Sequence, residues 1–182
     1  MAPKRQPTAG DMVRSLVVIL IPLVIITVLF TRNLSDHPVQ VVSYQATLTK
    51  ARAEAPYPVL APNNLPPSWR ATQAEWVPKG IPYLNDEPSV RNLWQLGFLA
   101  PDDIFIALNQ GDALPEQFVT DYTREGLPDG TSRVAGEPWE RRISPDERTR
   151  SRVRTSPAVT TVVVGDTPYE GLEAFAGTLR AE

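Results

Sequence analysis

The longest hydrophobic stretch of the chain, residues 15–31, contains seventeen residues without a charge. An α-helix rises about 1.5 Å per residue, so this stretch would span roughly 25 Å as a helix. Two apolar residues before Arg14, together with side chains of Arg14 and Arg32 that extend toward the headgroups, bring the length to a hydrocarbon core of about 30 Å. The pattern therefore predicts one transmembrane helix over residues 13–32.

Two other interpretations of this stretch are a cleavable signal peptide and a buried core helix. Lys4, Arg5 and Arg14 would form the basic start of a signal peptide. However, the sequence TRNLSDHP that follows contains no small-x-small cleavage site, and a chain without cysteine cannot be processed as a lipoprotein. A helix this uniformly apolar is also unusual in a small soluble domain. We therefore favour an uncleaved, single-pass anchor.

The charges that flank the anchor predict its orientation. Lys4, Arg5 and Arg14 precede the hydrophobic stretch, whereas Arg32 is the only basic residue close behind it. An excess of basic residues stays on the cytoplasmic side of a membrane. We therefore expect residues 1–12 to be a cytoplasmic tail and the chain beyond the anchor to lie outside the cytoplasmic membrane.

Residues 33–67 combine a helical pattern with a proline-rich segment. The sequence Ser-Asp-His-Pro at 35–38 resembles a helix start, and apolar residues recur at helical spacing up to Ala55, although VQVVSY would also suit a strand. Five prolines then fall within residues 56–67, which favours an extended backbone. We expect a juxtamembrane helix followed by a strap that lies against the domain, in preference to a flexible linker.

From residue 68 the hydrophobic pattern becomes that of an α+β domain. Alternating or continuous apolar runs predict strands, and apolar residues at helical spacing after Pro115 and Pro168 predict two helices. The expected strands are residues 69–77, 93–100, 104–109, 133–143, 148–155 and 159–165.

This order is that of two β-β-β-α units, residues 69–126 and 133–181. Strands followed by helices are typical of an antiparallel sheet that packs against its helices. The fold class is therefore α+β: one transmembrane helix, then an antiparallel sheet with helices packed on one side. We expect residues 68–182 to form the extracytoplasmic domain.

Charge and composition exclude several classes of protein. The chain has a formal net charge of −3, and its acidic residues lie almost entirely beyond the anchor. Nucleic-acid binding requires a basic surface, so we expect no nucleic-acid partner. The absence of cysteine excludes disulfides, thiolate metal sites and cysteine nucleophiles. Arginine greatly outnumbers lysine, which is typical of a GC-rich bacterial source.

Several short motifs resemble those of a known family. The pattern Ala-Pro-x-x-Leu-Pro-x-x-Trp-Arg-Ala-Thr covers residues 61–72, with Pro67-Ser68 where a glycine is expected before Trp69. Residues 136–141, 172–175 and 178–180 also fit. With the basic tail and single anchor, the chain resembles an actinobacterial family of membrane-anchored proteins of unknown function. The resemblance implies a location and a fold, and it brings no activity, cofactor or catalytic residue.

Acidic residues are the candidates for catalysis. Asp102, Asp103 and Glu116 could serve a carboxylate-dependent hydrolase, which needs two carboxyl groups a few ångströms apart. The alternative is turn and helix-start chemistry, since aspartate favours turns by bonding local backbone. The only histidine, His37, follows the anchor closely and is poorly placed for a catalytic relay. We predict no metal site and no cofactor.

Basic residues cluster in the second half of the domain and are the candidates for binding. Residues 133–154 contain seven arginines against four acids. Among them, Arg148, Arg150, Arg152 and Arg154 alternate, so that on a strand all four would face one side. Such a face could bind anionic lipid or an envelope polymer. The alternative is a solvated strand that is protected from edge pairing or neutralised by the acidic half. The four tryptophans are expected to cover the core rather than to form a ligand platform.

These features predict a non-catalytic binding, scaffolding or sensing module of the cell envelope. The expected partners are the bilayer, through residues 13–32, and an anionic lipid, an envelope polymer or a membrane protein. Two alternatives stay open: the carboxylate-dependent hydrolase, and a small-ligand carrier with an apolar pocket between sheet and helices.

Overall fold

The structure is a computed structural model that describes residues 9–33 and 41–181. The chain divides into two compact units, Met1–Val39 and Gln40–Glu182. The second unit therefore contains the proline-rich segment as well as the domain expected from residue 68. His37 and the helix start expected at residues 35–38 lie outside the described residues.

The first unit contains helix α1, Ala9–Asn33, which continues through Pro22. Its large apolar side chains from Met12 to Val28 are exposed. The hydroxyl of Thr27 donates to the carbonyl of Leu23 at 2.8 Å. Within residues 9–33 and 41–181, no helix combines the length and the apolarity that a membrane span requires.

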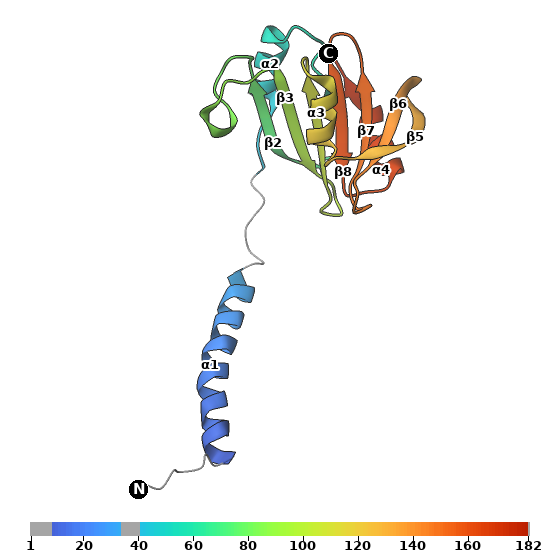
Figure 1. The fold of residues 1–182 in the computed structure, drawn as a ribbon. Coiled ribbons are helices and arrows are strands. Elements are labelled where there is room, and N and C mark those ends of the chain that lie inside the picture. The colour runs from blue at the N-terminus through green and yellow to red at the C-terminus, as the bar shows by residue number, and fades with distance from the viewer. Residues whose placement is uncertain (1–8, 34–40, 182) are drawn as a thin grey trace. The chain divides into compact units, whose positions relative to one another are not determined.

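The second unit is built on a seven-stranded antiparallel sheet (Figure 1), in the order β2-β3-β4-β8-β7-β6-β5. The strands are β2 (Arg70–Val77), β3 (Leu93–Leu99), β4 (Phe105–Gly111), β5 (Leu127–Val134), β6 (Glu137–Ile143), β7 (Arg150–Thr155) and β8 (Thr160–Gly165). The α+β class and the antiparallel sheet are confirmed.

Three helices and a small second sheet complete this unit. The helices are α2 (Gln45–Glu54), α3 (Pro115–Tyr122) and α4 (Tyr169–Gly177). The small sheet pairs β1 (Ala61–Pro62) with β9 (Leu179–Arg180). It therefore joins the proline-rich segment to the end of the chain.

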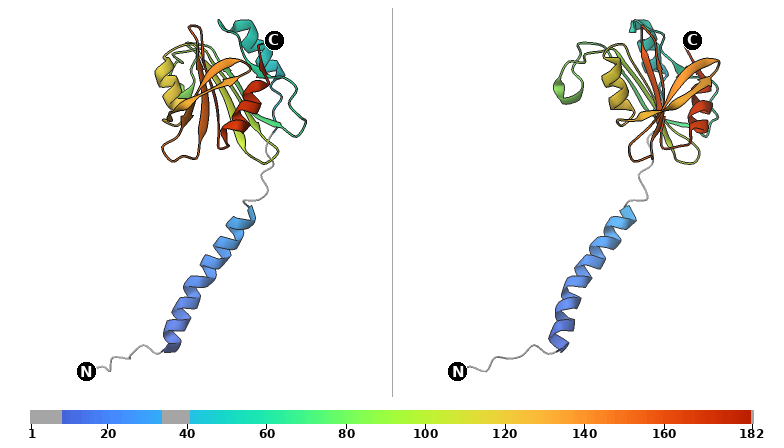
Figure 2. Two further views of the ribbon diagram at one scale, coloured as in Figure 1. Left: turned by 90° about the vertical axis from the view of Figure 1, so that its right-hand side faces the viewer. Right: turned by 45° about the vertical axis from the view of Figure 1, so that its right-hand side comes forward.

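The helices lie on both faces of the large sheet, so the expectation of helices on one side is wrong. In Figure 2, α3 lies on one face and α4 on the other. The core clusters agree with this, because the buried residues of α2 and α4 belong to one cluster and those of α3 to a second one. We call the face under α2 and α4 the closed face, and the face that carries α3 the open face.

The proline-rich segment lies against the closed face, as the sequence predicts for a strap. Val59 and Leu60 are buried. The Gln110 side chain of β4 accepts a hydrogen bond from the backbone N–H of Leu60 at 2.7 Å and donates one to the carbonyl of Pro58 at 3.2 Å. The indole N–H of Trp94 donates to the carbonyl of Leu60 at 2.9 Å. These hydrogen bonds give partners to the backbone groups of the proline-rich segment, which cannot pair with a neighbouring strand in the regular way.

The open face is covered by α3 over only part of its area. Phe118 and Val119 of α3 pack on Leu93 and Val162 of the sheet. Gly111 permits this close approach, because a Cβ atom there would lie 2.7 Å from the Phe118 ring. The rest of the open face is left for the groove described below.

Three further details differ from the sequence prediction. Residues 133–143 are not one strand: β5 turns into β6 at Ala135 and Gly136, whose φ angles are +50° and +86°. The second of the two expected β-β-β-α units therefore has four strands, β5 to β8, rather than three. Helix α2 begins only at Gln45. The sequence Thr-Pro-Tyr-Glu at 167–170 predicts a capping box at the start of the last helix, but α4 has Pro168 as its N-cap and no side-chain cap.

Candidate functional site

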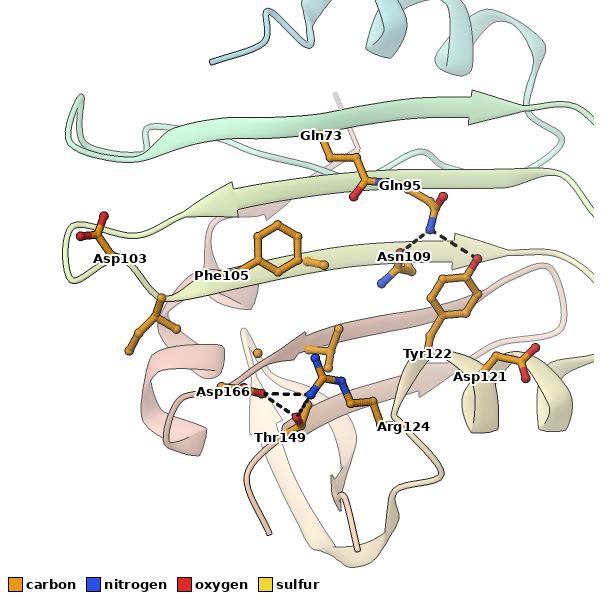
Figure 3. Close-up of a pocket in the computed structure, with 14 residues that line it drawn as sticks. Gln73, Gln95, Asp103, Phe105, Asn109, Asp121, Tyr122, Arg124, Thr149 and Asp166 are labelled. Carbon is orange, nitrogen blue, oxygen red and sulfur yellow. Dashed lines mark hydrogen bonds and ion pairs between the residues drawn. The ribbon is translucent and has the colours of Figure 1, made fainter. Parts of the chain in front are cut away.

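A groove of about 540 Å³ lies on the open face, beside α3 (Figure 3). Its volume falls within the range of about 300–1,000 Å³ that is typical of small-molecule sites. Strands β2, β3 and β4 form its floor, and the segments around Tyr122, Thr149 and Asp166 form its far wall. This groove is the candidate functional site.

Three amide side chains lie on the floor of the groove: Gln73, Gln95 and Asn109. The strand register explains why they meet, because Gln95 pairs with Asn109 and Gln73 pairs with Gly97, two residues further along β3. Residues that pair directly, or that are two apart on a strand, point to the same face. Three amides from three neighbouring strands are therefore collected on one surface.

Both ends of the Gln95 side-chain amide form hydrogen bonds within the protein. Its side-chain NH2 donates to Oδ1 of Asn109 at 3.1 Å and to the hydroxyl of Tyr122 at 3.4 Å. Its side-chain carbonyl accepts from the hydroxyl of Tyr83 at 2.7 Å. Gln95 therefore fixes the orientation of Asn109, and it has little capacity left for a ligand.

The phenols beside this network stay protonated. Burial, together with the nearby charge of Tyr83, raises the pKa of Tyr122 to about 12. Burial and the neighbouring Glu75 carboxylate also raise the pKa of Tyr83. At neutral pH both hydroxyls are uncharged hydrogen-bonding groups.

Asn109 has unused hydrogen-bonding capacity. Only 4% of the residue is exposed, and its Oδ1 accepts from Gln95. Among the described residues its Nδ2 has no hydrogen-bond acceptor. Figure 3 shows this nitrogen on the side away from Gln95, facing the groove. The nitrogen is not among the buried atoms that lack a partner, so it is accessible from the groove and free to bond a group that enters it.

Phe105 forms an apolar surface at the other end of the floor. The residue is 45% exposed, and its ring lies on Gly97 of the neighbouring strand, where a Cβ atom would come within 2.7 Å of the ring. Glycine at this position therefore allows the ring to lie against the sheet. Figure 3 shows the ring nearly face-on, lying across the strands.

The charged side chains on the far wall are paired with one another. Arg124 donates to the hydroxyl of Thr149 at 3.0 Å and lies 3.9 Å from the carboxylate of Asp166. The Thr149 hydroxyl donates to the same carboxylate at 2.5 Å. Arg124 is therefore largely neutralised within the protein.

The acids proposed for catalysis are not brought together. Asp102 and Asp103 lie in the turn between β3 and β4, where Asp103 forms an ion pair with Arg70 at 2.7 Å. Glu116 lies in the first turn of α3, which follows the other end of β4. The seven residues of β4 separate the two places by roughly 20 Å, far more than a glycosidase pair allows. Within the described residues, no group of three or more His, Cys, Asp or Glu side chains could hold a metal ion.

The arginines proposed for binding lie on the closed face. Arg152 is 0% exposed and forms an ion pair with Glu173 of α4. Arg150, Arg152 and Arg154 do share one face, but their guanidinium groups pack on aromatic rings. The guanidinium carbons of Arg150 and Arg152 lie 5.8 and 5.0 Å from the centre of the Tyr169 ring. That of Arg154 lies 5.2 Å from the centre of the Trp139 ring.

The fourth arginine, Arg148, precedes β7 and is exposed. The alternation is thus mainly a packing feature, and Arg152 belongs to the interior. Burial lowers the pKa of Arg152, and the Glu173 carboxylate opposes this effect. The tryptophans also cover the core: Trp76, Trp94 and Trp139 are buried.

The sequence prediction missed the groove residues. The usable signal is confined to Gln95, the single polar position of β3, and to Asn109, which with Gln110 interrupts the apolar run of β4. A polar residue in a buried strand usually has a specific partner. Which strands pair, and on which face α3 lies, could not be deduced from that signal.

Comparison with known proteins places the chain in a family. Residues 4–179, nearly the whole chain, match the family described as protein of unknown function, DUF4245. The chain belongs to the DUF4245 family. No curated protein matches it.

Among solved structures, this DUF4245 protein is similar to a chain in the complex of Pseudomonas aeruginosa MucA and MucB. The identity is 15%, the match covers 66% of this chain and 34% of that chain, and the TM-score is 0.35. The chain thus spans about a third of that protein's length. A similarity of this extent carries no argument about fold or function.

Proposed function

We propose that this DUF4245 protein is a membrane-tethered binding module of the cell envelope, which holds a small ligand in the open-face groove without transforming it. The observation that carries the proposal is the groove itself, with the accessible and unpaired Nδ2 of Asn109 facing into it. The floor of the groove carries amides and an exposed ring beside a protonated phenol, and these groups are suited to bind and orient a ligand.

The tether is supported by the sequence. The proposed single pass rests on the uncharged run of residues 15–31, with Arg14 and Arg32 extending outward, and on the large apolar side chains of α1, which are exposed from Met12 to Val28. The basic residues before the segment favour a cytoplasmic N-terminus. The proposal thus gives the bilayer as one partner and places the domain outside the cytoplasmic membrane. The actinobacterial source and the shared motif over residues 61–72 belong to the same proposal.

The groove favours a binding module over the two alternatives. A carboxylate-dependent hydrolase needs convergent acids, whereas Asp103 and Glu116 lie near opposite ends of β4. A carrier of apolar ligands needs an apolar pocket between sheet and helix, whereas the floor of this groove carries three amides. The arginine face is less suited to an anionic partner than the sequence suggests, because Arg152 is buried.

Filling the groove tests the binding function. Ala107 lies on the floor of the groove, and Ala174 is an exposed residue of α4 on the other face. The full chain in phospholipid nanodiscs would be incubated with the small-molecule fraction of an envelope extract and washed, and its bound compounds would be identified by mass spectrometry. We expect wild type and Ala174→Leu to retain the same compound, and Ala107→Leu to lose most of it. Recovery of nothing, or of the same compounds from all three proteins, would overturn the proposal.

The tether and its orientation need a separate test. We expect the full chain to stay with membranes after an alkaline carbonate wash. A protease added to intact spheroplasts should cut the domain, while an epitope before residue 8 stays protected. Release by carbonate would contradict the anchor, and protection of the domain would contradict the orientation.

A further inference from the structure

The surface of the groove has a flat apolar end and a polar end. The Phe105 ring rests on Gly97 and is 45% exposed, so one of its faces is free for a ligand. Asn109 lies four residues further along β4 on the same face, about 13 Å away at the rise of a strand. A ligand that contacts both must be extended, with an apolar face at one end and hydrogen-bonding groups at the other.

The polar end is suited to hydroxyl groups. A side-chain amide offers both donors and an acceptor, and a hydroxyl group also donates and accepts. Nδ2 of Asn109 is a donor held in place by the bond from Gln95 to Oδ1. The amide of Gln73 is exposed on the neighbouring part of the floor. The side-chain amides of the groove can thus form hydrogen bonds with hydroxyl groups of a ligand, and neither partner carries a charge.

The charges of the groove disfavour an anionic ligand. Arg124, the basic residue of the lining, is bonded to Thr149 and lies against Asp166. Asp103 and Asp121 also line the groove. Asp103 is paired with Arg70, so Asp121 leaves the lining with a net negative charge. A purely apolar ligand would leave Nδ2 of Asn109 buried and unpaired, at a cost in binding free energy.

We propose that the ligand of the groove is a neutral oligosaccharide, an inference that rests on the binding function proposed above. The C–H face of one sugar ring stacks on Phe105, and hydroxyl groups of a neighbouring ring bond to Asn109 and Gln73. A free oligosaccharide and a chain end of an envelope polysaccharide share this chemistry.

The inference is tested by titrating the full chain, in nanodiscs free of glycolipid and sugar detergent, with neutral tetrasaccharides. The probes are tetrasaccharides of glucose, mannose, galactose and N-acetylglucosamine, with tetra-alanine as an uncharged peptide. We expect at least one tetrasaccharide to bind in isothermal titration calorimetry. Phe105→Leu, which keeps an apolar side chain but removes the flat ring, should weaken binding roughly three- to tenfold.

Two further variants keep the test independent of folding. Phe105→Trp keeps a flat ring and should bind within about twofold of wild type, and Leu127→Ala, at an exposed apolar residue of β5, should not change binding. Tighter binding of an envelope polysaccharide than of its tetrasaccharide would identify the polymer as the source. Binding of tetra-alanine alone, binding of no tetrasaccharide, or binding that Phe105→Leu leaves unchanged would each overturn the carbohydrate inference. The function proposed above would still stand if the extract experiment yields a different compound that Ala107→Leu loses.

Discussion

The two faces of the seven-stranded sheet differ in how the side-chain amides of β4 are satisfied. Gln110 and Asn109 are neighbours in β4 and point to opposite faces. On the closed face Gln110 is bonded to the strap, and it also donates to the hydroxyl of Thr161 at 3.3 Å. On the open face Asn109 is bonded to Gln95 and keeps a donor without an acceptor. The same chemical group is therefore structural on one face and available on the other.

The difference follows from what covers each face. The strap, α2 and α4 bury the closed face. The strap bonds the amide of Gln110, and Glu173 of α4 bonds Nη2 of Arg152, whose Nε and Nη1 have no hydrogen-bond partner among the described residues. Helix α3 covers only part of the open face and leaves Phe105 45% exposed. Partial cover produces both the groove and its unpaired donor. We therefore expect substitutions on the closed face to affect stability, and those in the groove to affect binding.

The largest expected effect is a difference in the free energy of unfolding between substitutions of two phenylalanines on neighbouring strands. Phe98 is buried on the closed face and contacts the rings of Tyr44, Trp69 and Phe175, whereas Phe105 is half exposed. Phe98→Ala should lower the free energy of unfolding by about 3–5 kcal/mol, because it leaves a cavity. Phe105→Ala should cost only about 1 kcal/mol. Urea denaturation measures both, and equal losses would contradict the division into a closed and an open face.

The next effect concerns Arg152. Arg152→Ala should lower the free energy of unfolding by about 2–4 kcal/mol, because it leaves the partly buried carboxylate of Glu173 without its main partner. The matched control Arg148→Ala, at an exposed residue outside β7, should change stability by less than about 0.5 kcal/mol. Thermal unfolding of the two variants decides the point. Similar behaviour would mean that Arg152 belongs to the surface.

A smaller loss is expected at the strap. Gln110→Leu should cost about 1–3 kcal/mol, because the N–H of Leu60 and the carbonyl of Pro58 lose their buried partner. The same substitution at the exposed Gln73 should lie within about 0.5 kcal/mol of wild type. Hydrogen exchange at Leu60 should become faster in Gln110→Leu only. Unchanged protection at Leu60 would show that the strap does not depend on this side chain.

The smallest effect is a pH dependence on the open face. The pKa of Tyr122 is about 12 in the folded protein and about 10 in the unfolded chain, so its contribution to stability is complete below pH 10. The contribution is lost as the pH rises from 10 toward 12. Tyr122→Phe should therefore make the fall of stability over this range shallower in a urea titration at several pH values. Tyr57, Tyr83 and Tyr169 also have raised pKa values, so part of the fall should persist. An unchanged slope in Tyr122→Phe would contradict the buried, neutral phenol.

The hydrophobic pattern predicts much of the large sheet and two of its helices, because period 2 and period 3.6 are local properties. It fails at β5, whose eight residues are largely exposed and are ordered by pairing with β6 rather than by burial. The turn at Ala135 and Gly136 lacks the Asn-Gly or Asp-Gly signal that marks most such turns.

The pattern also cannot tell which face a helix will cover. Alternation correctly groups Arg150, Arg152 and Arg154, but only the three-dimensional fold shows that the first two pack on Tyr169 of α4 and the third on a ring of β6. For the same reason the groove, which joins residues from β2, β3, β4 and the loop after α3, could not be located from the sequence. The floor depends on the register of β2, β3 and β4, and the far wall brings in Tyr122, Thr149 and Asp166 from distant parts of the chain.

The most direct test compares the side-chain NH2 resonances of Asn109 and Gln110 by NMR while the tetrasaccharides are added to the full chain in nanodiscs. The account predicts a saturable shift of the Asn109 signal with at least one tetrasaccharide, smaller shifts at Gln73 and Gln95, and no change at Gln110. A shift at Gln110 as large as that at Asn109, or no shift at Asn109 with any of them, would contradict a carbohydrate site on the open face.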